Sequence, residues 1–280
     1  MEDTGMKRDS GSDHPSQPHG LVQRVRQRAL QGVGDTVARG VISSAERVTR
    51  AINSTPDGSR TFFDVKDFAF ARRLEHNWHL IRRELDDLMR GVDLIPNLQD
   101  ISHEQRDVTT DDRWKMFVLY AYGLKVENNC RRCPQTTRLV EGIPGMKSAM
   151  FSILRGGKHL PAHYGHYNGV LRYHLGLIVP EPDKCRIRVG QDMGSWAEGS
   201  SLIFDDTHDH EVWNDSDKDR VVLFVDFLRP LPPVLDGLNR MVVKMIGLSP
   251  YIRKGEENMK RWEEYFGQEL DLRRSSGKQS

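Results

Sequence analysis

The stretch VLRYHLGLIV, residues 170–179, alternates in a way that predicts a β-strand with two different faces. Successive side chains of a strand point to opposite sides, so every second residue shares a face. The faces are Leu171, Tyr173, Leu175 and Leu177 on one side and Arg172, His174 and Gly176 on the other. A buried unpaired arginine is unfavourable, so the second face either meets solvent or lines a pocket that holds an anion.

Further short apolar runs surround this strand between residues 114 and 230. Clusters of Gly, Pro and Asp separate the runs, and no helical pattern lies between them. Strands spaced in this way predict a mainly β fold with flanking helices, arranged as a sandwich or barrel of the jelly-roll kind. The runs are AMFSIL, CRIRVG, SLIF, HEVWN and RVVLFVDFL.

Helical patterns flank this β region on both sides. FARRLEHNWHLIRRELDDLM repeats apolar residues at helical spacing before it, and VLDGLNRMVVKMIGL and ENMKRWEEYFGQEL follow it. We therefore divide the chain into six parts. These are a disordered segment (1–20), a basic amphipathic helical segment with a linker (21–58), a helical lead-in (59–111), the β core (112–231), C-terminal helices (232–270) and a disordered tail (271–280).

Composition excludes several classes of protein. A formal net charge of +1 over 280 residues gives no electrostatic reason to expect a nucleic-acid partner. The N-terminal residues lack the apolar core of a signal peptide, and no apolar run approaches the length of a membrane span. Three cysteines do not make a disulfide framework. We therefore expect a cytoplasmic protein.

Residues 22–52 place Val, Ala and Ile on one helical face and six arginines on the remainder. Such a segment is typical of a helix at an anionic membrane or against a partner. It is equally typical of a peripheral helix packed on its own domain. Peripheral contact with the inner face of a membrane is thus one expectation for this segment.

Polar residues interrupt apolar faces on two further strands. Arg220 shares a face with Val222 and Phe224, and Ser152 lies between Met150 and Leu154. Two arginines on separate strands suit a small dicarboxylate, since guanidinium and carboxylate form paired hydrogen bonds. His163 and His210 lie at predicted strand edges, each followed by an arginine nine or ten residues later. Imidazole suits iron, copper and zinc, although two histidines alone indicate a metal only weakly.

Taken in order, HYGHYNGVLRYHLGL, CRIRVG, FDDTHDHEVWN and the following arginine resemble the aspartyl/asparaginyl β-hydroxylase family. The resemblance implies a double-stranded β-helix (cupin-like) and an iron(II)- and 2-oxoglutarate-dependent dioxygenase. CPQT, LRYHLGLIVP and LNRMVVKMIG also look like a bacterial branch that hydroxylates acyl chains of lipid A.

The resemblance also implies a role for each site residue. His163 and His210 would be the iron ligands, Arg220 with Ser152 would hold the distal carboxylate of 2-oxoglutarate, and Arg172 with His174 would contact the carboxylate next to the keto group. O2 is the second cosubstrate implied, and ascorbate is a candidate reductant.

One expected ligand is absent from the sequence. Many non-haem iron oxygenases use His-x-Asp or His-x-Glu with a distant histidine. Neither pattern occurs in this chain, and Gly165 stands where the carboxylate would be. The resembling hydroxylases share this feature, so we expect two protein ligands to the iron.

The expected reaction is hydroxylation of an unactivated C–H bond. The first hypothesis for the substrate is an aspartyl or asparaginyl side chain in a peptide or protein. The alternative is a fatty-acyl chain of a membrane lipid similar to lipid A. A non-catalytic cupin-like binding protein is the alternative of a different class.

Overall fold

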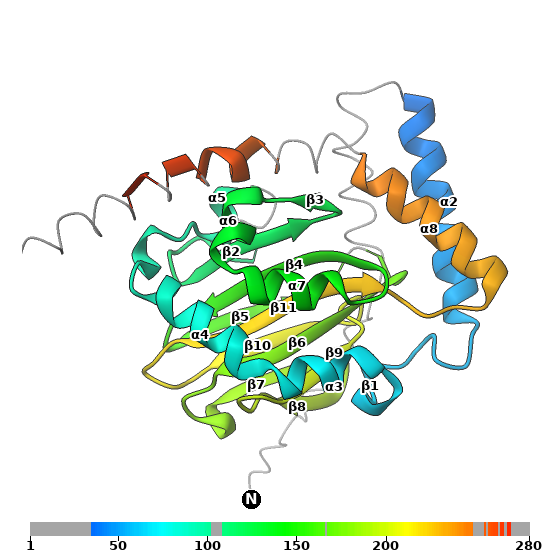
Figure 1. Ribbon diagram of the computed structural model, residues 1–280. Helices are drawn as coiled ribbons and strands as arrows, with labels where there is room; N and C mark the ends of the chain where they lie inside the picture. Colours follow the sequence, from blue (N-terminus) through cyan, green and yellow to red (C-terminus); the bar gives the residue numbers. More distant parts are fainter. Residues whose placement is uncertain are drawn as a thin grey trace, which may run out of the picture.

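The computed structural model describes residues 35–101, 108–165 and 167–248, together with residues 255, 257–262, 264, 265, 268 and 269. The segments expected to be disordered, 1–20 and 271–280, and residues 21–34 of the basic segment lie outside these residues. Two antiparallel sheets face each other and form a cupin-like β-sandwich with flanking helices (Figure 1).

The larger sheet has seven strands and contains the stretch from which the prediction began. That stretch forms β6, at Val170–Ile178, and lies between β9 and β11. In spatial order the strands are β1 (Phe62–Phe63), β9 (Ser201–Phe204), β6, β11 (Arg220–Leu228), β4 (Met146–Leu154), β2 (Trp114–Ala121) and β3 (Leu124–Lys125).

The smaller sheet has four strands, in the order β5 (Lys158–His163), β10 (His210–Asn214), β7 (Cys185–Val189) and β8 (Asp192–Ser195). β5 was not among the predicted strands, and His163, which was expected at a strand edge, is its last residue. Pro161 weakens the strand signal there, but a proline is tolerated on an edge strand, which is what β5 is.

Helices cover the outer face of the larger sheet. α3 (Ala69–His76), α4 (Trp78–Met89) and α7 (Pro134–Glu141) lie over it in Figure 1. Leu74, Ile81 and Leu85 are fully buried there, against the apolar face of β6. One helix was predicted over α3 and α4. The helix is interrupted at Asn77, whose side-chain amide donates to the carbonyl oxygen of Arg73 at 2.8 Å.

The core between the two sheets is formed by a second apolar cluster, which includes Phe204, Val222, Phe224 and Ile187. The expectation that no helix interrupts the β region was wrong, because two helices lie between β3 and β4. One of them is α7, and the other is among the smaller helical elements that connect the strands. These are α5 (Leu98–Ile101), α6 (Glu127–Arg132), and the 3-10 helices η1 (Val65–Asp67), η2 (Val92–Leu94) and η4 (Pro182–Lys184).

Two helices from opposite ends of the chain pack together beside the sandwich (Figure 1). α2 (Asp35–Asn53) lies within the segment expected to be basic and helical, and α8 (Pro233–Gly247) follows β11. Val48 and Ile52 of α2 are buried with Val242 and Val243 of α8. Among the helices of the described residues, none combines the length and the apolarity needed to cross a bilayer.

Candidate active site

The six residues expected to form the site come together between the two sheets. Each lies on a strand: Ser152 on β4, His163 on β5, Arg172 and His174 on β6, His210 on β10 and Arg220 on β11. The larger sheet supplies four of them, and the smaller sheet supplies the two histidines.

His163 and His210 are cross-strand partners of β5 and β10, although 47 residues separate them in the chain. Their ring centroids lie 4.0 Å apart, with the rings tilted by 50°. The antiparallel register therefore brings the two imidazole rings close together. Burial lowers the pKa of His163, and burial followed by the charge of His163 lowers the pKa of His210 to about 3. Both rings are neutral at pH 7, which is the form that binds metals.

The backbone fixes which nitrogen of each ring is free. Nδ1 of His163 lies 2.7 Å from the carbonyl oxygen of Pro161, and Nδ1 of His210 lies 3.1 Å from that of His208. A carbonyl oxygen only accepts, so Nδ1 carries the proton in both rings. Nε2 keeps its lone pair, and a hydrogen bond at the opposite nitrogen is the usual way to orient a metal-binding imidazole.

Arg220 lies deep in the same interior and is 2% exposed. Its Cζ is 4.4 Å from the centroid of the Trp196 ring, while Nε and Nη1 are buried with no hydrogen-bond partner. Among the described residues no carboxylate pairs with it, and burial lowers its pKa to about 10. A buried cation without a counter-ion is unfavourable, so the position is suited to an anion that the chain does not itself supply.

Ser152 lies beside this cation. It is the register partner of Val222 on β11, two residues beyond Arg220. Nε1 of Trp114 donates to Ser152 Oγ at 3.0 Å. The hydroxyl hydrogen of Ser152 therefore remains for a further acceptor, as an anion held by Arg220 would provide.

His174 lies between the two histidines and Arg220, within an aromatic enclosure. The ring centroids of Phe204 and Phe224 are each 5.1 Å from it, and that of Trp196 is 5.8 Å away. Neither ring nitrogen has a hydrogen-bond partner. Burial, followed by the charges of Arg220 and Arg172, holds the pKa of His174 well below its usual value. The ring is neutral and offers one donor and one acceptor to an occupant.

Arg172 differs from Arg220 because the chain supplies its counter-ions. Nη1 lies 2.8 Å from Asp206, Nε lies 3.1 Å from Asp226, and Cζ is 4.2 Å from the centroid of the Phe224 ring. Burial opposes its charge, but the two carboxylates outweigh burial and raise its pKa. Sequence analysis missed both carboxylates. Asp226 could have been found, since it alternates with Arg220 along β11.

Asp206 also occupies the space beside Gly165. A Cβ at Gly165 would meet the Asp206 carboxylate, and the Gly165 amide donates to the Asp206 carbonyl oxygen at 2.6 Å. The position expected to hold a ligand in a His-x-Asp pattern is therefore filled by a carboxylate from the turn before β10. Among the described residues, no group of three or more His, Cys, Asp or Glu side chains is arranged to hold a metal ion.

The register of the strands places the site residues at different depths between the two sheets. On β11, Arg220 is followed by Phe224, the partner of His174, and by Asp226, the partner of Arg172. Phe224 is four residues from Arg220, or about 13 Å along the strand. His163 and Arg172 are half-buried, whereas Arg220 is almost inaccessible. We call the end that contains the half-buried His163 and Arg172, with the buried His210 beside them, the histidine end of the sandwich.

Two ion pairs hold the turn that precedes His210. Asp205 pairs with Arg229 in the interior and accepts from the amide and the hydroxyl of Thr207, at 3.0 and 2.6 Å. Asp209 pairs with Arg188 at 2.9 Å. These contacts fix the turn from which His210 follows, and they engage the Asp209 carboxylate with Arg188.

His159 and the three cysteines lie outside the site. His159 stacks on Trp213 and lies 2.7 Å from Glu211 on the outer surface of the smaller sheet. Cys130, Cys133 and Cys185 are buried free thiols. Burial raises the pKa of each of them, which agrees with a structural role.

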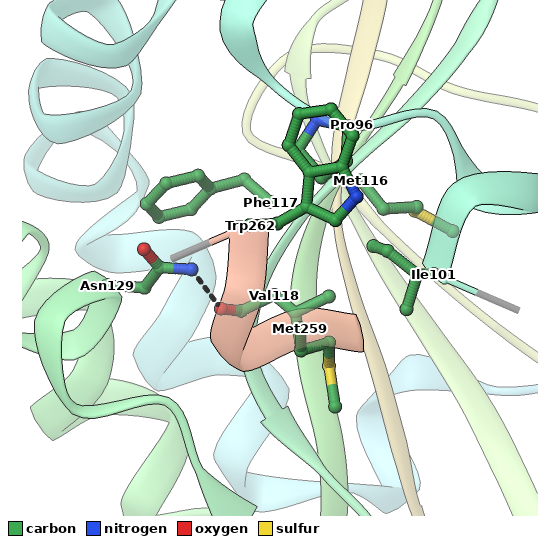
Figure 2. A pocket seen from close by; sticks show the side chains of 8 residues that line it. All are labelled: Pro96, Ile101, Met116, Phe117, Val118, Asn129, Met259 and Trp262. Atoms are coloured by element: carbon green, nitrogen blue, oxygen red, sulfur yellow. Dashed lines mark hydrogen bonds between the residues drawn. The ribbon is translucent and has the colours of Figure 1, made fainter. Parts of the chain in front are cut away.

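A separate apolar pocket lies against β2 (Figure 2). Met259 and Trp262 of the C-terminal segment close it over Met116 and Val118, and Asn129 donates to the carbonyl oxygen of Val118 at 2.8 Å. None of the six expected site residues lines it. Its apolar lining provides no means of holding a metal or an anion.

The fold and the site define a cupin-like protein with two neutral imidazoles above a buried cation, as a metal-dependent enzyme with an anionic cosubstrate requires. The family model for aspartyl/asparaginyl beta-hydroxylase matches residues 75–230. The chain therefore belongs to the aspartyl/asparaginyl β-hydroxylase family of iron(II)/2-oxoglutarate dioxygenases, and it is a hydroxylase.

Individual relatives differ in their substrates. An ornithine lipid ester-linked acyl 2-hydroxylase from Rhizobium tropici is 46% identical over 222 residues, which cover 79% of each chain. The human aspartyl/asparaginyl beta-hydroxylase is 35% identical over 167 residues, covering 57% of this chain but only 21% of that protein. The cupin domain of Cnp3 from Schizosaccharomyces pombe is similar with a TM-score of 0.31 and 12% identity, covering 49% of this chain and 77% of that one.

Proposed function

We propose that the protein uses iron(II), 2-oxoglutarate and O2 to hydroxylate an acyl chain of a polar membrane lipid of the ornithine-lipid type, at the carbon next to the ester carbonyl. The assignment of 2-oxoglutarate as cosubstrate is supported by Arg220, whose buried guanidinium has no anionic partner among the described residues. The assignment of a lipid substrate is supported by the 46% identity with an ornithine lipid acyl 2-hydroxylase, which extends over 79% of both chains.

The residues fit the two absent groups in charge and in protonation. His163 and His210 would hold iron(II) through Nε2, since Nδ1 of each donates to a carbonyl oxygen. Arg220 and Ser152 would bind the distal carboxylate of 2-oxoglutarate, and His174 would donate to the other end. When bound, iron(II) and 2-oxoglutarate supply the oxygen activation, with succinate and carbon dioxide as coproducts.

The chain itself provides orientation and exclusion of water. Trp196, Phe204 and Phe224 enclose His174, so a bound dicarboxylate would be held in a largely apolar interior where its ion pair with Arg220 is strong. Arg172 stays with Asp206 and Asp226, and it would present at most one guanidinium edge to the cosubstrate. We therefore expect Arg172 to stabilise the site more than it binds 2-oxoglutarate.

The first substrate hypothesis, an aspartyl or asparaginyl side chain, is now the second candidate. Its support is the 35% identity with the human aspartyl/asparaginyl hydroxylase, and this match covers only about a fifth of that protein. Family membership also favours an enzyme over the non-catalytic binding protein.

A paired assay tests the proposal. The purified protein is incubated with iron(II), 2-oxoglutarate and ascorbate, and with either ornithine lipid in detergent or a pool of Asp- and Asn-containing peptides. We expect one added oxygen atom on the lipid, located at carbon 2 of the ester-linked chain by fragmentation, and none with His210→Ala. Oxygen on the peptides alone would reverse the order of the two candidates.

A further inference from the structure

The helix α8 exposes a continuous apolar stripe to solvent. Val234 is 82% exposed, Leu238 45%, Met241 56% and Leu248 59%, and Met245 on the same line is half-buried. These residues recur at intervals of four and three, so at 3.6 residues per turn they occupy an arc of about 80° and a length of about 21 Å. Of the seven large apolar side chains exposed among the described residues, three lie on α8, and a fourth, Leu248, directly follows its last residue.

The opposite face of α8 is already occupied. Val242 and Val243 are buried against α2, and Asn239 is fully buried. Met245, at the edge of the stripe, packs against this buried cluster, whereas the exposed side chains of Val234, Leu238 and Met241 point away from it. A contiguous exposed apolar face of this kind marks a docking surface.

Positive charge lies next to the stripe. Lys244 and Arg240 are exposed on the adjoining arc of α8, and Arg47 and Arg50 are exposed on α2. Among the described side chains of these two helices, the only carboxylates are Glu46 and Asp236, which are half-buried, and Asp236 pairs with Arg240 at 2.7 Å. An apolar stripe with cations at its border is suited to a bilayer surface that carries anionic headgroups.

The same helix is attached to the segment that follows a proposed metal ligand. Asn239 accepts a hydrogen bond from the hydroxyl of Tyr167 at 2.9 Å and donates to the carbonyl oxygen of Gly169 at 2.8 Å. From α2, Asn53 accepts from the Asn168 amide at 2.7 Å. The α2–α8 pair is thus fixed a few residues after His163, at the histidine end of the sandwich.

We propose that the stripe of α8, formed by Val234, Leu238, Met241, Met245 and Leu248, docks the enzyme on an anionic bilayer so that the histidine end reaches the acyl chains. The proposal rests on the lipid substrate proposed above. It places the membrane contact on α8, beyond the basic segment 22–52 in which the sequence predicted such a contact.

Vesicle binding and turnover test the docking surface separately from the substrate. The variant L238Q/M241Q removes two apolar side chains and keeps good helix formers, and Ala69→Gln at an exposed position of α3 is the matched control. We expect the double variant to bind vesicles of phosphatidylglycerol and phosphatidylcholine at least about tenfold more weakly, and Ala69→Gln to bind like the wild type.

Turnover is measured on ornithine lipid in the same vesicles and on a monomeric short-chain analogue. The double variant should lose activity only on the vesicles. Equal vesicle binding by wild type and double variant, or none by the wild type, would overturn the docking surface. So would a wild-type dimer that the double variant loses, because a second copy would then cover the stripe. A wild type inactive on both lipid forms would refute the proposed substrate, while the binding measurement would still decide the docking.

Discussion

The Cζ atom of Arg220 lies 4.4 Å from the centre of the Trp196 ring, and no carboxylate among the described residues forms an ion pair with it. The aromatic face offsets only part of what the guanidinium loses on leaving water, since a cation–π contact contributes about 0.5–2 kcal/mol. The free protein therefore contains an unfavourable charge at the bottom of its site. An anionic cosubstrate would remove that penalty when it binds.

Replacing Arg220 should consequently affect the free and the bound protein in opposite directions. In Arg220→Met the buried charge is gone, so we expect the melting temperature without ligand to stay the same or to rise. The stabilisation by 2-oxoglutarate with manganese(II) should disappear, and the apparent KM for 2-oxoglutarate should rise about 30-fold or more. Thermal unfolding with and without cosubstrate measures both effects. Undiminished stabilisation of the variant by 2-oxoglutarate would show that another residue binds it.

Replacing His163 or His210 should have an effect that replacing His159, a third histidine on β5, does not have. His163→Ala and His210→Ala should abolish manganese(II) binding and 2-oxoglutarate turnover, because each removes one of two metal-binding nitrogens. His159→Ala is the matched control on β5, where the ring stacks on Trp213 outside the site. Calorimetric titration of manganese(II) checks the binding. Normal metal binding by either of the first two variants would contradict the assignment.

Gly165 is restricted by its neighbour rather than by its own backbone. The sequence alone suggests that Gly165→Asp would restore a metal ligand, but the Asp206 carboxylate occupies the place of any side chain there. We therefore expect Gly165→Ala to destabilise the protein by about 1–3 kcal/mol, as overpacking does. In an Asp206→Gly background the same change should be nearly neutral. Denaturant unfolding of the four proteins gives the coupling between the two sites, and additive effects would disprove the contact.

Arg172 should behave as a structural cation. Arg172→Ala removes the cation that pairs with the buried Asp226 carboxylate, and breaking such a pair destabilises by about 3–5 kcal/mol. Burial already raises the pKa of Asp226 against the opposing effect of Arg172. In Arg172→Ala/Asp226→Asn the lost stability should be partly recovered. Urea unfolding measures this, and a variant of normal stability whose KM for 2-oxoglutarate is raised would instead assign Arg172 to the cosubstrate.

Alternation along single strands was sufficient to predict much of the site. The period-2 pattern of residues 170–179 placed Arg172 and His174 on one face and the leucines on the other, and the structure confirms both faces of β6. The same reasoning selected Arg220 and Ser152. A strand has only two faces, so a polar residue at an apolar position can be recognised without knowing any neighbour.

Contacts between strands could not be predicted in this way. Nothing in the sequence separates Arg172, which has two carboxylates, from Arg220, which has none, because Asp206 reaches Arg172 from a turn 34 residues away. The pairing of His163 with His210 depends likewise on the register of β5 and β10, and β5 itself was concealed by Pro161. Trp196 lies after β8, where no periodicity applies.

The sequence by itself determined the class of fold and the family, and it selected the candidate site residues, because these depend on local alternation and on the order of short motifs. Only the tertiary structure decided which charges are neutralised, which nitrogen of each histidine is free, and that α8 presents an apolar stripe to solvent. Those properties depend on what lies across a sheet or against a helix. Long-range packing sets them, and it is not encoded in any one segment of the chain.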